Sequence, residues 1–271
     1  MTDAFRLDGQ HVLITGAGGG LGTAMCRAFA AAGANVTVAE HPGRLDAARD
    51  LAGELGRSQE VRTGAVAFDV TEVVSIERAF AQAEDALGPL NVVVANAGIN
   101  IPKPALEVTE DDWDRVLDID LKGVFFTCQA AGRRMVPRGQ GAIVSIASQN
   151  GVIGMPNRAA YCAAKAGVVN LTRVLALEWA PAVRVNAVGP TFVETPLTRT
   201  TLADPAIRGE ILHRIPLGRL GTPDEVANAV LFLSSPAASL IPVPRCLLTE
   251  VGPLFDRGCT RSGVGWRYNP G

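Results

Sequence analysis

Two side chains with acid–base chemistry, Tyr161 and Lys165, lie four residues apart in the second half of the chain. The segment 158–179 has helical periodicity, and residues four apart project from one face of a helix. A tyrosine, with an ordinary pKa of about 10, becomes a base near neutral pH where a neighbouring ammonium stabilises its phenolate. The pair therefore indicates proton transfer at a substrate oxygen. A tyrosine at a subunit interface beside a surface lysine is the alternative interpretation.

A serine at the end of an apolar strand suits the same chemistry. Ser148 follows the predicted strand 142–147, and ligands of open α/β sheets bind beyond the carboxyl ends of the strands. A secondary alcohol gives up hydride only as its hydroxyl proton leaves, so an oxygen base must lie within hydrogen-bond distance of it. Ser148, Tyr161 and Lys165 are therefore the candidate catalytic residues.

A sheet with covering helices is needed to position these residues. Short Val- and Ile-rich runs alternate with longer segments of helical periodicity, the pattern of βαβ units around a parallel sheet. The predicted strands are 11–15, 35–39, 61–67, 91–95, 142–147 and 183–188, and the predicted helices are 21–32, 44–55, 73–87, 110–135, 158–179 and 224–233. We predict an α/β fold, a doubly wound parallel sheet, with a single domain over residues 1–239.

Composition argues against several classes of partner. The 271 residues carry 25 basic and 27 acidic side chains, and a net charge of −2 disfavours nucleic acid and anionic membranes. No apolar run reaches the roughly 18 residues of a membrane span, and the first six residues do not resemble a signal peptide. The five cysteines lack CxxC spacing and the three histidines lie far apart, so we expect reduced thiols, no metal site and a cytoplasmic protein.

A glycine-rich turn joins the first predicted strand to the first helix. Residues 15–22 read TGAGGGLG, and glycines there let the backbone approach a pyrophosphate at the positive end of the helix. A flexible surface loop is the alternative interpretation. The TGxxxGxG spacing, taken with Ser148, Tyr161 and Lys165 in order, resembles the short-chain dehydrogenase/reductase family over residues 11–239.

The resemblance implies a Rossmann fold and a set of site residues. It implies that Lys165 holds the nicotinamide ribose as well as lowering the pKa of Tyr161, and that Ser148 hydrogen-bonds the substrate oxygen. Asn150 is a further candidate for substrate binding. Besides Tyr161 and Lys165, the implied cofactor contacts are Gly16, Gly19, Gly20, Leu21, Gly22, Glu40, Asp69, Val70, Asn96, Ala97, Gly98, Pro190, Thr191, Val193 and Thr195.

The second predicted strand ends on the residue that bears on cofactor choice. Glu40 is placed where an acid accepts hydrogen bonds from the adenosine ribose hydroxyls and repels a 2′-phosphate. We therefore predict NAD rather than NADP. Arg44 keeps NADP as an alternative because an arginine there can bind a 2′-phosphate; a solvated surface arginine is the other interpretation.

Two positions near the predicted site depart from the family's pattern. Asp120 stands where the resemblance implies an asparagine that holds a proton-relaying water. An ionised aspartate accepts hydrogen bonds but donates none, so we predict that Asp120 still holds the water and changes how protons leave. An ordinary helical surface acid is the alternative. Thr191 follows Pro190 where the family usually has glycine, and a side chain restricts that turn.

The C-terminal tail, residues 240–271, departs further. The family ends on a seventh strand and an aspartate with two glycines, whereas Pro242 and Pro244 disfavour a central strand here. Codons exist for residues 240–254 whose reading one nucleotide earlier spells DTGATLPVDGGWTA. We therefore hypothesise a frameshift in the gene or its recorded sequence, which a clean in-frame read and a matching intact mass would refute. In a genuine tail, residues 247–249 are expected to pair as a weak edge strand.

Together these features predict an NAD-dependent oxidoreductase that interconverts a secondary alcohol and a ketone, with Tyr161 as acid/base. Gln149, Asn150, Met155 and Asn157 lie between Ser148 and Tyr161 and favour a polyol, sugar acid or similar hydroxylated substrate. A 3-oxoacyl-thioester reductase and a non-catalytic NAD-binding sensor or scaffold are the alternatives. Residues 197–214 predict either a mobile lid or a plain pair of surface helices. The resemblance implies a homotetramer, with a dimer as the alternative.

Overall fold

The computed structural model describes residues 3–240 and 247–248, apart from the side chains of Thr200, Leu247 and Leu248. A parallel sheet forms its centre, with the strand order β3-β2-β1-β4-β5-β6-β7. The strands are β1 His11–Thr15, β2 Asn35–Glu40, β3 Thr63–Ala67, β4 Leu90–Ala95, β5 Ala142–Ile146, β6 Arg184–Gly189 and β7 Leu247–Leu248. The first six form the doubly wound arrangement of a Rossmann-like fold, which confirms the predicted fold class.

The edge strand β7 consists of two residues beside β6. Leu247 pairs with Val188 and Leu248 with Gly189, in parallel register. This is the place where the sequence predicts a weak edge strand. Most of the tail that the frameshift hypothesis concerns, residues 241–246 and 249–271, lies outside the described residues, and so does Thr249 of the predicted edge strand.

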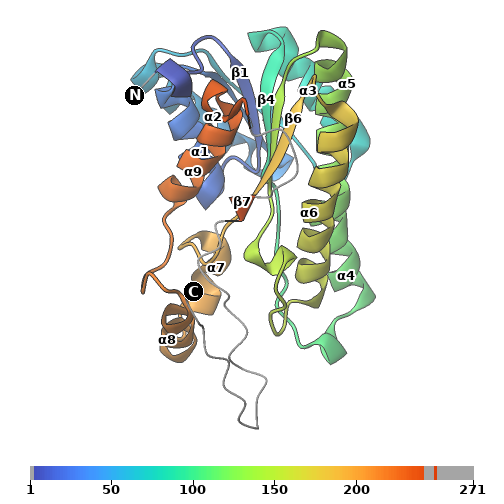
Figure 1. The fold of residues 1–271 in the computed structure, drawn as a ribbon, viewed down its shortest axis with the longest axis vertical. Helices are drawn as coiled ribbons and strands as arrows, with labels where there is room; N and C mark the ends of the chain where they lie inside the picture. The colour runs from blue at the N-terminus through green and yellow to red at the C-terminus, as the bar shows by residue number, and fades with distance from the viewer. Residues whose placement is uncertain (1–2, 241–246, 249–271) are drawn as a thin grey trace, which may run out of the picture.

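Helices cover both faces of the sheet (Figure 1). They are α1 Gly20–Ala31, α2 Leu45–Gln59, α3 Val73–Leu87, α4 Glu110–Leu117, α5 Gly123–Met135, α6 Ala159–Trp179, α7 Pro196–Leu202, α8 Pro205–Arg214 and α9 Pro223–Ser234. Successive strand residues point to opposite faces, so Val12 and Ile14 pack with α1, α2 and α9, while Leu13 packs with α3, α5 and α6. Strands buried on both faces explain the nearly continuous apolar runs.

The predicted helix 110–135 is interrupted in the structure. A π-helical turn, η4 Asp118–Lys122, separates α4 from α5, and the amide of Gly123 donates to the carbonyl of Asp118, five residues earlier. A Cβ atom on Gly123 would lie 2.4 Å from Cγ2 of Val70, so only glycine allows this close approach. The turn directs Asp120 into the interior, where its side chain is fully buried. Apolar periodicity does not distinguish such a turn from continuous helix.

Two short helices, α7 and α8, follow β6 and lie below the sheet in Figure 1. They occupy most of the segment predicted as a lid or a pair of surface helices. At the start of α9, Thr222 and Glu225 form the capping box. Within the described part of the chain, no helix has the length and apolar character needed to cross a membrane.

Candidate active site

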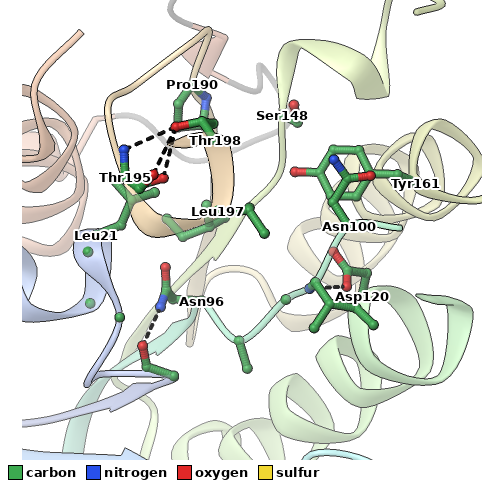
Figure 2. Close-up of a pocket in the computed structure, with 18 of the residues that line it drawn as sticks. Leu21, Asn96, Asn100, Asp120, Ser148, Tyr161, Pro190, Thr195, Leu197 and Thr198 are labelled. Atoms are coloured by element: carbon green, nitrogen blue, oxygen red, sulfur yellow. Dashed lines mark hydrogen bonds between the residues drawn. The ribbon is translucent and has the colours of Figure 1, made fainter. Parts of the chain in front are cut away.

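A cleft opens at the carboxyl ends of the strands, between the neighbouring strands β1 and β4. The chain leads from β1 towards one edge of the sheet and from β4 towards the other. Figure 2 shows Ser148, Tyr161 and Asn100 on one side of it and Leu21 and Thr195 on the other. Apart from Asp69, the predicted catalytic and cofactor-binding residues all line this cleft together with Asn150, namely Gly16, Gly19, Gly20, Leu21, Gly22, Glu40, Val70, Asn96, Ala97, Gly98, Asp120, Ser148, Asn150, Tyr161, Lys165, Pro190, Thr191, Val193 and Thr195.

The glycine-rich turn forms a cradle without side chains. Gly16 has a φ of +61°, a conformation that glycine adopts at little cost. A Cβ atom on Gly22 would lie 2.4 Å from the carbonyl oxygen of Gly16, which the tight turn does not permit. Helix α1 begins at Gly20, and its N-cap, Gly19, offers no side-chain hydrogen bond. Free amides at a helix N-terminus facing a cleft fit the pyrophosphate of a dinucleotide.

The carboxylate of Glu40 sits against this turn. It is 5% exposed, and its Oε2 accepts a hydrogen bond of 2.7 Å from the amide of Gly18. The exposed Arg44 donates to the carbonyl oxygen of Gly18 at 2.8 Å, so both side chains reach the same residue. A carboxylate has further lone pairs for ribose hydroxyls, and the guanidinium beside it lies where a 2′-phosphate would be accommodated.

Residues after β4 tie this strand to the glycine turn. The side-chain amide of Asn96 donates to the carbonyl oxygens of Thr15, at 2.8 Å, and Gly16, at 3.1 Å. Oγ1 of Thr15 accepts the amides of Asn96 and Ala97, each at 3.0 Å. Asn96 therefore holds the shape of the cleft floor through hydrogen bonds within the protein.

Asp69 is the predicted site residue that does not line the cleft. Its Oδ1 accepts hydrogen bonds from the amide of Thr71, at 2.9 Å, and from its hydroxyl, at 2.7 Å. Its neighbours Phe68 and Val70 line the cleft instead. A turn-forming hydrogen bond to the residue two positions on is the common local use of aspartate.

A buried ion pair lies beneath the catalytic candidates. Nζ of Lys165, 3% exposed, is 3.1 Å from Oδ2 of Asp120 and donates to the carbonyl oxygen of Ile146 at 2.9 Å. Oδ1 of Asp120 accepts the amide of Ile99 at 2.7 Å. Burial, the largest single cause, acts to lower the pKa of Lys165, but the charges of Asp120 and Tyr161 and the hydrogen bond with Asp120 together raise that pKa above its ordinary value. Lys165 is therefore a cation, and Asp120 is not a surface acid.

Tyr161 lies beside this pair, on the face of α6 that the four-residue spacing predicts. Nζ of Lys165 is 5.5 Å from the centroid of the tyrosine ring. Burial raises the pKa of Tyr161, and Asp120 adds to the increase, while Lys165, a hydrogen bond with Ser148, and Arg158 oppose it. Because Asp120 shares the charge of Lys165, the phenolate of Tyr161 receives less stabilisation from the lysine than the four-residue spacing by itself predicts.

Ser148 and the segment after β6 complete the walls. Oγ of Ser148, 9% exposed, accepts the amide of Asn150 at 3.2 Å, which holds the serine at the cleft. Across the cleft, the amide of Thr195 donates to Oγ1 of Thr198 at 3.0 Å in the cap of α7. A Cβ atom on Gly20 would lie 3.0 Å from Cδ of Pro196, so the start of α7 packs directly on the glycine turn.

Asn100 and Arg158 are among the polar residues of the cleft that sequence reasoning missed, as are His41 and Thr198. Arg158 stands three positions before Tyr161, at the N-cap of α6, and Asn100 follows Gly98 by two. Their closeness in sequence to Tyr161 and Gly98 was the signal by which the sequence could have indicated them. Asn157, predicted as a polar contact, is exposed and outside the lining.

The fold and this cleft define a dinucleotide-dependent oxidoreductase of the doubly wound α/β class, and comparison with known proteins agrees. The family model described as Enoyl-(Acyl carrier protein) reductase matches residues 16–242. D-threitol dehydrogenase of Mycolicibacterium smegmatis is 41% identical over 239 residues, which cover 88% of this chain and 90% of the relative. Galactitol 2-dehydrogenase (L-tagatose-forming) of Cereibacter sphaeroides is 42% identical over 241 residues, covering 88% and 92%.

A solved structure of a similar protein has the same fold. The gluconate 5-dehydrogenase of Burkholderia cenocepacia, crystallised with NADP and tartrate, superposes with a TM-score of 0.86 at 34% identity, over 91% of this chain and 95% of that one. The chain belongs to the short-chain dehydrogenase/reductase family. It is an NAD(P)-dependent dehydrogenase that acts on CH–OH groups.

Proposed function

We propose that this enzyme interconverts a secondary alcohol and a ketone on a small polyhydroxylated compound, with NAD as cofactor and Tyr161 as acid/base. The observation that carries the proposal is the packing of Tyr161 beside the buried cation Lys165, in one cleft with Ser148 and the glycine cradle. The relatives named above act on polyols and sugar acids, which supports the same substrate class.

Each catalytic side chain has one task in oxidation. Ser148 orients the substrate hydroxyl, and Tyr161 accepts its proton while hydride leaves the carbon. A bound oxidised nicotinamide supplies the hydride acceptor. Lys165 stabilises the phenolate by its charge, and Asp120 holds Lys165 in place and reduces the charge that Tyr161 experiences. In the reverse direction Tyr161 returns the proton to the carbonyl oxygen.

The NAD preference is proposed from Glu40. Its buried carboxylate, fixed on the amide of Gly18, repels the 2′-phosphate of NADP, and the exposed Arg44 offsets this only in part. We expect Glu40→Gln to shift the ratio of kcat/KM values towards NADP by about tenfold, a typical weight for one charge contact. Arg44→Gln is the matched control, and it should shift the ratio the other way.

Assembly is proposed to be a homotetramer of cytoplasmic chains, each one domain over residues 1–239. Helices α4 and α6 pack on one another and leave large apolar side chains exposed, namely Trp113 at 41%, Val174 at 42% and Leu177 at 66%. Figure 1 shows both helices on the outer side of the molecule. Exposed apolar side chains on neighbouring helices suit a subunit contact. Sedimentation of a monomer at micromolar concentration would contradict both the tetramer and the alternative dimer.

One absorbance assay of nicotinamide reduction tests the catalytic proposal. NAD and NADP are offered in parallel with polyols and sugar acids, and the reverse reaction is offered acetoacetyl thioester. We expect NAD reduction by hydroxylated compounds. Turnover of the thioester alone would select the 3-oxoacyl reductase alternative. NAD binding by calorimetry without any turnover would select the sensor or scaffold alternative.

A further inference from the structure

Buried polar atoms without a hydrogen-bond partner gather in the cleft. Among the described residues, six buried side-chain atoms lack a hydrogen bond, and five of these belong to the cleft lining. One of the five, Oδ2 of Asp120, is held in the ion pair with Lys165, so the atoms without any partner belong to Asn100, Gln149, Asn150 and Arg158. Buried polar groups are nearly always paired, because an unpaired one loses its hydration without compensation. Because these residues line the same cleft as Tyr161, the cleft is suited to a polar ligand.

Arg158 is the charged donor of this group. It is 7% exposed, its NH2 donates to Oγ1 of Thr201 at 3.0 Å, and its NH1 has no partner. No carboxylate of the described residues lies within ion-pair distance of it. A guanidinium remains charged at any ordinary pH, so this is a buried cation without a counter-ion.

A second buried arginine shows what a purely structural one looks like here. Arg184 donates from NH1 to the carbonyl oxygen of Leu233 at 2.5 Å, and from NH2 to those of Ser234 at 3.1 Å and Ser235 at 3.3 Å. These carbonyls end helix α9, whose negative dipole end suits a cation. Arg184 is thus satisfied by the protein, whereas Arg158 lines the cleft with one donor group unpaired.

The position of Arg158 relative to Tyr161 indicates that its counter-ion would come from the substrate and not from the cofactor. Arg158 lies at the N-cap of α6, three residues before Tyr161, and near enough for its charge to act on the tyrosine. The glycine cradle that suits the cofactor pyrophosphate lies across the cleft, at Leu21 in Figure 2. The other unpaired atoms nearby are the side-chain oxygens of Asn100, Gln149 and Asn150, which accept hydrogen bonds from hydroxyl groups.

We propose that Arg158 binds an anionic group of the substrate, so that the enzyme acts on a polyhydroxylated acid or phosphate ester in preference to a neutral polyol. This inference rests on the proposed function. A carboxylate and a phosphate ester share the chemistry, since both pair with the donor fork of a guanidinium. A neutral alditol would leave the buried charge unpaired.

Matched substrates test the proposal. D-gluconate and D-glucitol have the same hydroxyl pattern and differ at C1, as a carboxylate or a CH2OH group, and glucitol 6-phosphate carries the anion as a phosphate ester. Their kcat/KM values are compared in the wild type, in Arg158→Gln, and in Arg199→Gln as the control. Arg199 is an exposed arginine of α7 outside the cleft lining, so its variant removes the same charge without touching the site.

We expect the wild type to prefer one of the anions over glucitol, and Arg158→Gln to lower that preference by about 30-fold, the weight of one charged hydrogen bond. Arg158→Lys should restore part of the preference because it keeps the charge, which also separates anion binding from a folding defect. Arg199→Gln should leave the preference unchanged. Preference for gluconate or for the phosphate identifies which anion Arg158 binds.

Two outcomes would overturn the proposal. One is a wild type that prefers glucitol to both anions, and the other is an Arg158→Gln variant that loses activity equally on all three compounds; both leave the dehydrogenase assignment intact. If no alcohol is oxidised with either cofactor, the proposed function fails. Calorimetric titration with gluconate and with glucitol 6-phosphate then decides, since equal binding of both by the wild type and Arg158→Gln rejects the role of Arg158.

Discussion

The two ends of the sheet treat buried polar groups in opposite ways. At the amino end of β1, His11 is 1% exposed, and its ring bonds the carbonyl oxygen of Gly88 at 2.7 Å and Oγ1 of Thr37 at 2.8 Å. Its backbone amide donates to Oδ1 of Asn91 at 2.8 Å. At the carboxyl end, Asn100, Asn150 and Arg158 each keep an unpaired buried atom.

This difference in hydrogen bonding distinguishes the polar residues that stabilise the fold from those that are available to bind a ligand. Burial alone does not separate His11 from Arg158, because both are nearly inaccessible. Hydrogen bonding separates the two residues. The polar groups of a structural site are paired within the protein, whereas those of a binding site keep atoms unpaired until the ligand binds. Variants at the amino end should therefore change stability, and those at the carboxyl end should change turnover.

The largest expected effect is at the carboxyl end. Tyr161→Phe removes the proton acceptor and keeps the ring, so we expect kcat to fall by about 10³-fold, within the range of general base catalysis. Calorimetry should show NAD affinity close to that of the wild type. Near-normal turnover by this variant would remove Tyr161 from the mechanism.

At the amino end, His11→Leu should lower the free energy of unfolding by about 2 kcal/mol or more, because Thr37 and the carbonyl of Gly88 lose their partner. Urea unfolding measures this change. Turnover per folded molecule should stay at the wild-type level. A variant of normal stability with reduced kcat would break the contrast between the two ends.

The same histidine gives the amino end a pH signature. Burial is the main cause that holds the pKa of His11 below its ordinary 6.5. The unfolded chain then binds more protons below pH 6.5, so stability is lost as the pH falls through that value towards the folded pKa. His11→Leu should lack this part of the acid dependence, with Thr37→Val, which keeps the histidine, as the control.

Asp120→Asn tests the buried pair at the carboxyl end. The negative charge of Asp120 adds to the burial that raises the pKa of Tyr161, so its removal should lower that pKa and move the rise of the oxidation rate to lower pH. Activity at neutral pH is then equal or higher. Asp118→Asn on the same π-helical turn, outside the cleft lining, is the control. A collapse of turnover at every pH would show that the carboxylate itself is required.

The smallest effect sets the scale for an exposed hydrogen bond. Oγ1 of Thr222 accepts the amide of Glu225 at 3.2 Å in the cap of α9, away from the cleft lining. Thr222→Ala should cost about 1 kcal/mol of stability and leave kcat unchanged. A loss as large as that of His11→Leu would mean that burial does not amplify the value of a hydrogen bond in this fold.

Local signals predicted the regular elements well. Strand β1 and helix α3 have their predicted bounds, and the other predicted strands end within two residues of them. The capping box at Thr222 and the shared face of Tyr161 and Lys165 also follow from neighbouring residues. These features depend on periodicity and capping, which act over a few residues.

The sequence by itself determined the doubly wound sheet, the glycine cradle and the residue types of the proton-transfer pair. Only the tertiary structure decided that a π-helical turn buries Asp120 against Lys165, that Asp69 turns to Thr71, and that Arg158 lines the cleft without a counter-ion. The reason is physical: a side chain's charge balance and pKa depend on what lies within a few ångströms in space, and those neighbours come from distant parts of the chain.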